Sequence, residues 1–219
     1  MAKRLIQLYT GLILYGVSIA IFVRAGLGLD PWDVFHMGLA LLTGLKIGQV
    51  IILVGVLVLL LWIPMRQKPG LGTLSNVIVL GLVADGVLAV FPPPHSLMIR
   101  SGCLVAAIII NAIATSMYIG AGFGAGPRDG LMTGLHTRTG WPVRRIRTCI
   151  ELTVLFSGWL MGGSVGVGTV LYALAIGPLI QLTLPWFAPR RSGRKSKSVT
   201  PDVTENSERQ SAADLRAEV

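Results

Sequence analysis

The chain has 219 residues, of which 53% are hydrophobic and only 13% are charged, and its mean hydropathy is +0.70. A soluble domain carries about 25% charged residues. This composition therefore argues against a soluble enzyme, a nucleic-acid-binding domain and a secreted scaffold held by disulfides. The net charge of +9 comes from Lys and Arg residues that stand between long apolar runs, as in membrane proteins whose basic loops set their orientation.

The first half of the chain is predicted to form four helices. A bilayer core about 30 Å thick requires roughly 17–25 apolar residues in a crossing helix, and Leu5–Val23 meets this requirement. No small-residue cleavage site follows Val23, so this segment is predicted to be a retained helix rather than a signal peptide. Pro31–Leu45 is shorter and is predicted to be helical without crossing, whereas Ile47–Ile63 and Gly72–Phe91 are predicted to cross.

The second half of the chain has the same order of segments. Leu97–Gly120 is long enough to cross, the short Pro127–Arg138 follows it, and Ile146–Gly162 and Gly168–Trp186 are again apolar. At 1.5 Å per residue the two short segments reach only about 18–22 Å, which is too little for a crossing. The sequence therefore predicts an all-α polytopic membrane protein with about six transmembrane helices and two short half-helices.

The basic residues indicate the orientation of these helices. With six crossings most Lys and Arg fall on one side of the membrane, and the positive-inside rule then places both termini in the cytoplasm. The exceptions on the other side are Arg24, Lys46 and Arg100. Eight full crossings are the alternative, and they fit the rule less well.

Residues 190–219 differ in composition from the rest of the chain. They begin with a basic stretch at 190–197, contain half of the ten acidic residues and show no apolar periodicity. A disordered cytoplasmic tail is predicted here. Its basic end would attract anionic lipid headgroups.

The two halves of the chain resemble each other at a constant shift. The shift from Pro31 to Pro127 is 96 residues, and the same shift aligns further Gly, Asp and Thr residues without a gap. The aligned blocks are Ala25-Gly26-Leu27-Gly28 with Ala121-Gly122-Phe123-Gly124, Pro31-Trp32-Asp33 with Pro127-Arg128-Asp129, Thr43-Gly44 with Thr139-Gly140, and Gly70-Leu71-Gly72-Thr73 with Gly166-Val167-Gly168-Thr169. Apolar matches mean little in a membrane protein, but these polar and glycine matches indicate a duplication.

The duplication predicts two membrane repeats, residues 1–95 and 96–189, followed by the tail. Three crossings per repeat is an odd number, so the second repeat would enter the membrane from the opposite side. Such inverted repeats are typical of secondary transporters, whose sites lie where interrupted helices meet near the membrane midplane. Four crossings per repeat would make the two repeats parallel instead.

The repeated blocks also carry a family resemblance. Gly28-Leu29-Asp30-Pro31-Trp32-Asp33, Gly126-Pro127-Arg128-Asp129-Gly130 and Gly166-Val167-Gly168-Thr169 resemble the YczE/YyaS/YitT group of bacterial integral membrane proteins, with the YczE branch closest. The resemblance covers about residues 5–187. It implies a bacterial cytoplasmic-membrane protein from a group sometimes classed with exporters, and it implies no substrate, catalytic residue or cofactor.

The two Pro-x-Asp segments have a structural and a functional interpretation. Pro31 and Pro127 suit the first position of a helix, Asp30 suits an N-cap, and Asp33 and Asp129 lie in a first turn where the helix dipole favours an acid. These features alone describe two well-capped helices. The functional interpretation is that the glycines let the chain break within the membrane, so that each helix start presents a carboxylate to a shared cavity.

Three further residues are candidates for binding a substrate or ion. Arg128 either pairs with the adjacent Asp129 or contacts an anion at the start of its helix. Asp85 lies about fourteen residues into a predicted span, and it is a candidate for a proton- or cation-coupling carboxylate or for a structural hydrogen bond between helices. Gln181 aligns with Asp85 in the second repeat.

Other polar residues favour structural roles. Arg147 and Glu151 are spaced for an ion pair on one helix face, Asn111 and Asn76 suit hydrogen bonds between helices, and His36 can share a proton with Asp33. These residues and the two cysteines show no spacing typical of a metal site, a cofactor site or a catalytic centre, and we expect no metal, no cofactor and no enzyme activity.

The leading functional hypothesis is a transporter or exporter of a small molecule or ion, in the cytoplasmic membrane, with its site between the two repeats. The alternative is a membrane accessory or regulatory protein that binds a cytoplasmic partner through the Thr137–Thr148 loop and the tail. The expected surroundings are the lipid bilayer and an unknown substrate, without nucleic acid. The sequence leaves open whether the chain is a monomer or a homo-oligomer.

Overall fold

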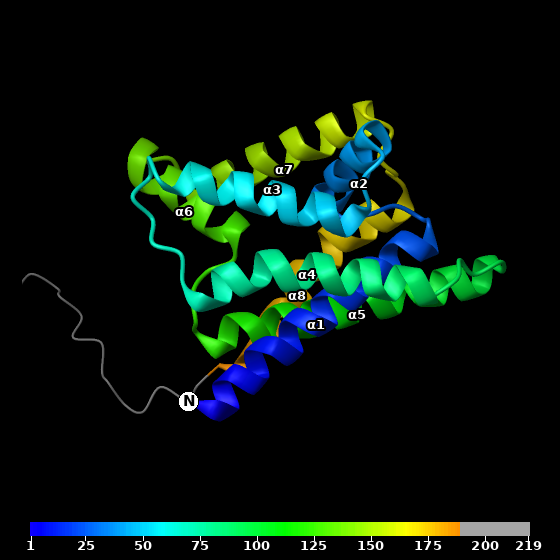
Figure 1. Ribbon diagram of the computed structural model, residues 1–219, viewed down its shortest axis with the longest axis horizontal. Helices are drawn as coiled ribbons and strands as arrows, with labels where there is room; N and C mark the ends of the chain where they lie inside the picture. Colours follow the sequence, from blue (N-terminus) through cyan, green and yellow to red (C-terminus); the bar gives the residue numbers. More distant parts are fainter. Residues whose placement is uncertain (189–219) are drawn as a thin grey trace, which may run out of the picture. The chain divides into compact units, whose positions relative to one another are not determined.

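A computed structural model describes residues 1–188, and the predicted tail lies outside these residues. The described chain forms eight α-helices (Figure 1). They are α1 (Ala2–Ala25), α2 (Pro31–Thr43), α3 (Ile47–Trp62), α4 (Leu71–Val90), α5 (Leu97–Ala121), α6 (Pro127–Thr139), α7 (Val143–Leu160) and α8 (Val167–Phe187). All eight predicted helices are confirmed, and each observed end lies within a few residues of the predicted one.

Six long helices run side by side along the molecule, and the short helices α2 and α6 lie at opposite ends (Figure 1). Hydrogen bonds show how two of the long helices are directed. The Arg4 side chain at the start of α1 donates from Nε to the carbonyl oxygen of Ala121 at the end of α5, at 2.9 Å. The Arg100 side chain at the start of α5 donates likewise to the carbonyl oxygen of Ala25, at 2.6 Å. The helices α1 and α5 are therefore antiparallel.

The lengths of the helices differ from the prediction in one respect. Within residues 1–188, α1, α4, α5 and α8 are long and apolar enough to span a membrane, and α2 with α3 passes the same test only as one unit bent by 112°. The helix α3 has 16 residues, or about 24 Å, and α7 carries four charged residues among its 18. Four of the six predicted spans thus meet the requirement for length and apolarity as single helices. The six crossings stay a prediction.

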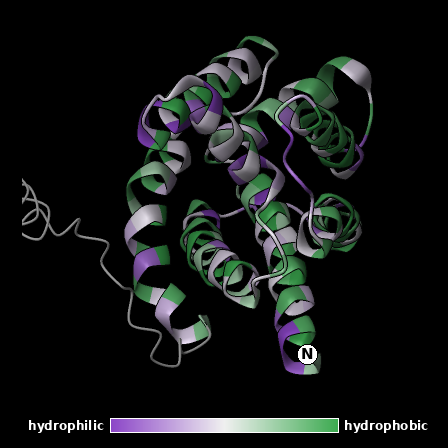
Figure 2. Ribbon diagram, turned by 90° about the vertical axis from the view of Figure 1, so that its left-hand side faces the viewer, coloured by the Kyte–Doolittle hydropathy of each residue, from purple (hydrophilic) through white to green (hydrophobic). Residues whose placement is uncertain are grey.

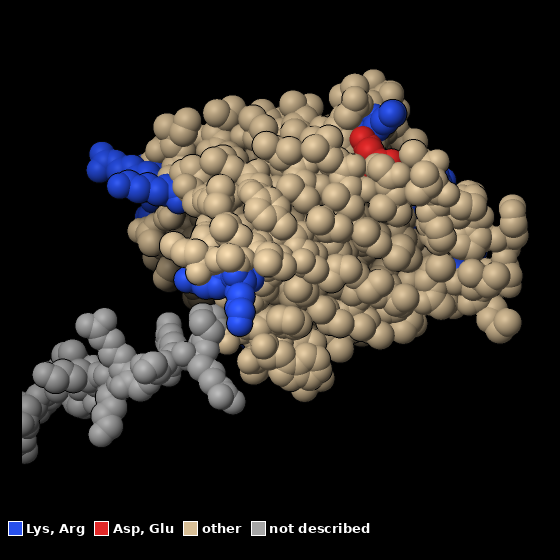
Figure 3. Space-filling model, turned by 60° about the horizontal axis from the view of Figure 1, so that its bottom comes forward, with Lys and Arg blue, Asp and Glu red and all other residues tan. Residues whose placement is uncertain are grey.

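The outer surface of these helices is apolar. Figure 2 shows hydrophobic residues along most of the helical ribbon, and Figure 3 shows a face whose middle is free of charged side chains, with Lys and Arg gathered toward its edges. Even α3 and α7 expose large apolar side chains. They are Leu53, Val56, Leu57, Leu60 and Leu61 on α3, and Val143, Leu152, Phe156, Trp159 and Leu160 on α7. An exposed surface of this kind is suited to lipid rather than to water.

The two halves contact each other through matching pairs of residues. The amide of Gly72 at the start of α4 donates to the carbonyl oxygen of Phe123 at 2.9 Å, and the amide of Gly168 at the start of α8 donates to that of Leu27 at 2.7 Å. Each residue of the second bond lies 96 positions from its counterpart in the first. The arginine contacts between α1 and α5 obey the same rule. Each half therefore supplies the partner for a helix start in the other half.

The predicted sidedness can be checked with single cysteines. In a chain with Cys103→Ser and Cys149→Ser, we expect Lys68→Cys and Gly140→Cys to react with a membrane-impermeant thiol reagent from the cytoplasmic side. Lys46→Cys and Pro93→Cys should react from the outside, because the chain reverses between these positions along α3 and α4. All four positions are exposed. Labelling of Lys46→Cys from the cytoplasm would replace six crossings with eight.

Candidate binding site between the two halves of the chain

A cavity of about 230 Å³ lies between the helices, and every one of the eight contributes to its wall. Apolar residues of α3, α4 and α8 form part of the lining. The polar and aromatic residues in the wall are Tyr15, Asp30, Trp32, His36, Asn76, Thr115, Tyr118, Arg128, Asp129, Arg147, Glu151 and Tyr172. Of the predicted site residues, Pro31, Pro127, Arg128 and Asp129 line this cavity.

The start of α2 is held by an aspartate. Pro31 occupies the first helical position, where its missing amide hydrogen would have no intrahelical partner. One oxygen of Asp30, Oδ1, accepts hydrogen bonds from the amides of Trp32 and Asp33, both at 2.9 Å. The predicted N-cap is therefore confirmed. Because α2 begins at the cavity, capping also fixes the Asp30 carboxylate, which is 2% exposed, in the cavity wall.

The start of α6 lacks such a cap. Gly126 occupies the position that Asp30 has at α2, and no side chain accepts a hydrogen bond there. Pro127 is again the first helical residue, and its carbonyl oxygen accepts a hydrogen bond from Nε1 of Trp62 on α3 at 3.1 Å. The starts of α2 and α6 thus have similar backbone structure but different charge, because Asp30 supplies a carboxylate at α2 whereas Gly126 has no side chain at α6.

Arg128 reaches from α6 toward the acids of α2. Its Nη1 lies 3.9 Å from Oδ1 of Asp30 and its Nη2 lies 3.8 Å from Oδ1 of Asp33. The guanidinium carbon is 4.8 Å from the centre of the Trp32 ring, within the range of a cation–π contact. Among the ion pairs of residues 1–188, Arg128 has no contact with Asp129. The first alternative for Arg128, a pair with its neighbour, is therefore wrong, because the side chain extends away from α6 to the other half.

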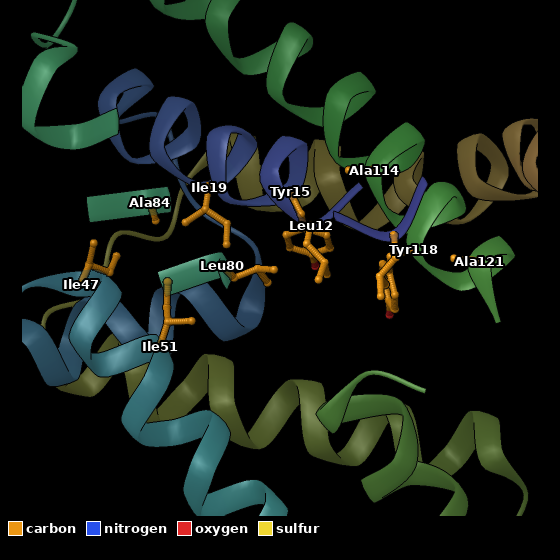
Figure 4. Packing of buried hydrophobic residues seen from close by; sticks show 11 residues of the cluster. Leu12, Tyr15, Ile19, Ile47, Ile51, Leu80, Ala84, Ala114, Tyr118 and Ala121 are labelled. Carbon is orange, nitrogen blue, oxygen red and sulfur yellow. The ribbon is translucent and has the colours of Figure 1, made fainter. Parts of the chain in front are cut away.

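The remaining acids of the site have separate partners. Asp33 is 1% exposed, and its Oδ1 lies 3.0 Å from Nδ1 of the buried His36, which agrees with the predicted contact. Asp129 is half-buried, and its Oδ2 accepts a hydrogen bond from the Tyr118 hydroxyl at 2.9 Å. Tyr118 packs edge-on against Tyr15, with ring centres 6.4 Å apart. Figure 4 shows both tyrosine side chains extending from α1 and α5 toward the same side.

Two predicted structural contacts are also observed. Nε of Arg147 lies 2.9 Å from Oε1 of Glu151, and this ion pair forms part of the cavity wall. The amide of Asn111 donates to the Ser18 hydroxyl at 3.0 Å and accepts from the Tyr172 hydroxyl at 3.3 Å. Asn111 therefore joins α5 to α1 and α8, as such amides commonly do between membrane helices.

Two predicted site residues lie elsewhere. Oδ1 of Asp85 accepts a hydrogen bond from the amide of Gly48 at 2.8 Å, at the start of α3, and Asp85 is not part of the cavity wall. This is the structural alternative, a bond between helices, and the α3 dipole favours a carboxylate at that place. Gln181 is exposed on α8 and is also absent from the wall. The structure therefore does not bring Asp85 and Gln181 together with Asp33 and Asp129.

Sequence reasoning missed the tyrosines of the site. Three of the four tyrosines of the chain, Tyr15, Tyr118 and Tyr172, line the cavity. A signal for Tyr15 was present, because membrane proteins concentrate Tyr near the two membrane surfaces whereas Tyr15 lies in the middle of α1. Their number within apolar spans could have indicated a polar interior.

Comparisons with known proteins show what the chain is related to. Residues 2–185 match the family described as "Family of unknown function (DUF6198)". An uncharacterized protein of Haemophilus influenzae is 36% identical over 182 residues, which are 83% of this chain and 84% of that protein. An uncharacterized membrane protein of Bacillus subtilis, YczE, is 36% identical over 183 residues, 81% of this chain and 83% of the relative. No solved structure matches.

These relatives agree with the resemblance of the repeated blocks and with the apolar helices. The protein is an integral membrane protein in a lipid bilayer, and its chain belongs to the DUF6198 family, in a YczE-like group.

Proposed function

We propose that this protein transports a small molecule or ion across the cytoplasmic membrane, and that the cavity is its binding site. The observation that carries the proposal is the composition of the cavity wall. All eight helices contribute, and Asp30 from one half lies 3.9 Å from Arg128 of the other, with Asp129 in the same wall. Charged groups within a membrane protein are costly and mark substrate or ion pathways.

The second element of the proposal is an inverted duplication. The antiparallel course of α1 and α5 and the matching contacts at a shift of 96 residues support it. In this arrangement α2 closes the cavity toward one side of the membrane and α6 toward the other. Rocking of the two halves would then open the same site to either side in turn.

The third element is the orientation, with both termini in the cytoplasm. The start of α1 and the end of α8 lie together, since Nε2 of Gln7 donates to the carbonyl oxygen of Phe187 at 3.1 Å. Both ends of the described chain therefore lie on one side, and the positive-inside rule makes this side the cytoplasm.

Transport by alternating access can be tested without knowing the substrate. Val54 lines the cavity from the middle of α3 and is 6% exposed. A cysteine at this position therefore reports whether a reagent reaches the interior of the cavity. In the cysteine-free chain, we expect Val54→Cys to react with an impermeant thiol reagent in both right-side-out and inside-out vesicles. Leu57→Cys is the matched control on the same helix, because Leu57 is 52% exposed on the apolar surface and should react from neither side.

The result separates the two functional hypotheses. Reaction of Val54→Cys from both sides supports a transporter. Reaction from one side only, or from neither, contradicts alternating access and favours the membrane accessory protein.

A further inference from the structure

The cavity has an excess of negative charge. Arg147 and Glu151 neutralise each other at 2.9 Å. This leaves the carboxylates of Asp30 and Asp129 in the wall, and that of Asp33 next to it on α2, with the guanidinium of Arg128. A carboxylate surrounded by protein is costly unless a positive charge or a hydrogen-bond donor compensates it. Within the described chain, these acids need more positive charge than Arg128 supplies.

Two buried oxygens identify where compensation is lacking. Oδ2 of Asp30 and Oδ2 of Asp33 accept no hydrogen bond, although the two residues are 2% and 1% exposed. Asp30 is part of the cavity wall, and Asp33 lies directly behind it at the start of the same helix. Both of these oxygens are acceptors, so a ligand that satisfies them must donate hydrogen bonds. The buried Nε1 of Trp32, a residue of the same wall, is an unpaired donor.

Arg128 lies beside the other oxygen, Oδ1, of each of these carboxylates, without forming a hydrogen bond to it. Its nitrogens remain 3.8 and 3.9 Å from the carboxylates, which exceeds the usual length of a hydrogen bond. Its guanidinium lies over Trp32, and 24% of the side chain is exposed. The Arg128 guanidinium is held only loosely beside two carboxylates and an aromatic ring. A free cation of the same chemistry would fit in its place.

The size and aromatic wall of the cavity restrict this cation further. A volume of 230 Å³ corresponds to about eight water molecules. Pockets for drug-sized ligands measure about 300–1,000 Å³, so a bulky cation would not fit. Trp32, Tyr15 and Tyr118 add ring faces and edges to the wall, and such rings favour a compact organic cation.

We infer that the cavity binds a small organic cation of the guanidinium or ammonium type, which donates a hydrogen bond to Asp30 and balances the charge of the adjacent Asp33, in exchange for the Arg128 guanidinium. The inference rests on the proposed function, because it names the substrate class of the proposed transport site. An anion there would face the carboxylates of Asp30 and Asp129, with Asp33 behind them, and is disfavoured.

The test is binding of methylguanidinium to the full-length protein in detergent, measured by calorimetry and by thermal melting. Methylurea is the matched neutral compound, since it has nearly the same shape without the charge, and acetate is the anionic comparison. We expect methylguanidinium to bind and to raise the melting temperature, and neither comparison compound to do so. Equal effects of methylguanidinium and methylurea, or binding of acetate alone, would overturn the inference.

Variants locate the binding. Asp30→Asn should weaken methylguanidinium at least about tenfold, which corresponds to about 1.4 kcal/mol, while Asn preserves the cap of α2. Arg128→Gln should tighten it, because the tethered competitor is removed. Asp85→Asn is the control outside the cavity and should leave the affinity unchanged. Binding that appears only in the Arg128 variant would show that the carboxylates serve Arg128 alone, and this too would overturn the inference.

The outcome is independent of the Val54→Cys labelling. Two-sided labelling without methylguanidinium binding would leave a transporter of another substrate class. Binding with one-sided labelling would leave a cation site in a protein that does not transport.

Discussion

Replacement of Gly28 by alanine is expected to destabilise the protein by about 2–6 kcal/mol, as strain and overpacking of about 1–3 kcal/mol each combine. Gly28 has a φ of +110°, which side-chain-bearing residues rarely adopt. A Cβ added there would lie 2.6 Å from the amide nitrogen of Gly166 and 2.8 Å from the Thr169 hydroxyl oxygen. These atoms belong to the start of α8, so the loop and the opposite half would have to separate.

Gly124 is the counterpart in the second half and should behave in the same way. Its φ is +120°, and an added Cβ would lie 2.8 Å from the Thr73 hydroxyl oxygen at the start of α4. The measurement is thermal melting of each variant in detergent, with size-exclusion chromatography to follow aggregation. A large loss for one variant and none for the other would contradict equivalent packing of the two halves.

Gly102→Ala is the matched control for these substitutions. Gly102 lies inside α5, and outside its own helix and chain neighbours no heavy atom lies within 4 Å of an added Cβ. Alanine should therefore preserve or raise stability, by up to about 1 kcal/mol, because it is the better helix former. Wild-type melting of Gly28→Ala beside this control would remove the tight junction between the halves as a source of stability.

The helices of this protein could be predicted from apolar runs bounded by glycine and proline. Pro31 and Pro127 mark helix starts because they restrict φ and lack an amide hydrogen, and Gly44 marks the end of α2 in the left-handed conformation. The lengths of the predicted segments could not show the bend between α2 and α3. That angle depends on packing of α2 against α7 in the other half, and no local pattern reports it.

The candidate site could be predicted only in part. Asp33, Asp129 and Arg128 were found because short polar blocks recur within apolar sequence. Asp85 was selected for its distance from the ends of its helix. A carboxylate at any depth can accept a hydrogen bond from the start of a neighbouring helix, and Asp85 accepts one from the Gly48 amide at the start of α3. Tyr118 was missed because its hydrogen bond to Asp129, eleven residues further along the chain, depends on how the chain turns between α5 and α6, which no local pattern reports.

The largest expected effects on transport come from the carboxylates of the candidate site. We expect Asp33→Asn and Asp129→Asn each to reduce the exchange of radiolabelled methylguanidinium in proteoliposomes at least about tenfold, since a hydrogen bond to a charged group contributes about 1.5–3 kcal/mol. Asparagine keeps the size of each side chain and can still accept from His36 or Tyr118. The substitution removes mainly the negative charge that balances a bound cation.

Asp85→Asn supplies the control for loss of an acid outside the cavity. Its amide oxygen can still accept the hydrogen bond from Gly48, and Asn caps a helix start almost as well as Asp, so both flux and melting temperature should stay near those of the wild type. Melting curves of all three variants separate the causes of any loss. If flux and stability fall together in Asp33→Asn and Asp129→Asn, these acids support the fold. If both variants exchange methylguanidinium at the wild-type rate, their charges take no part in transport, and they remain only the acids that stabilise the starts of α2 and α6.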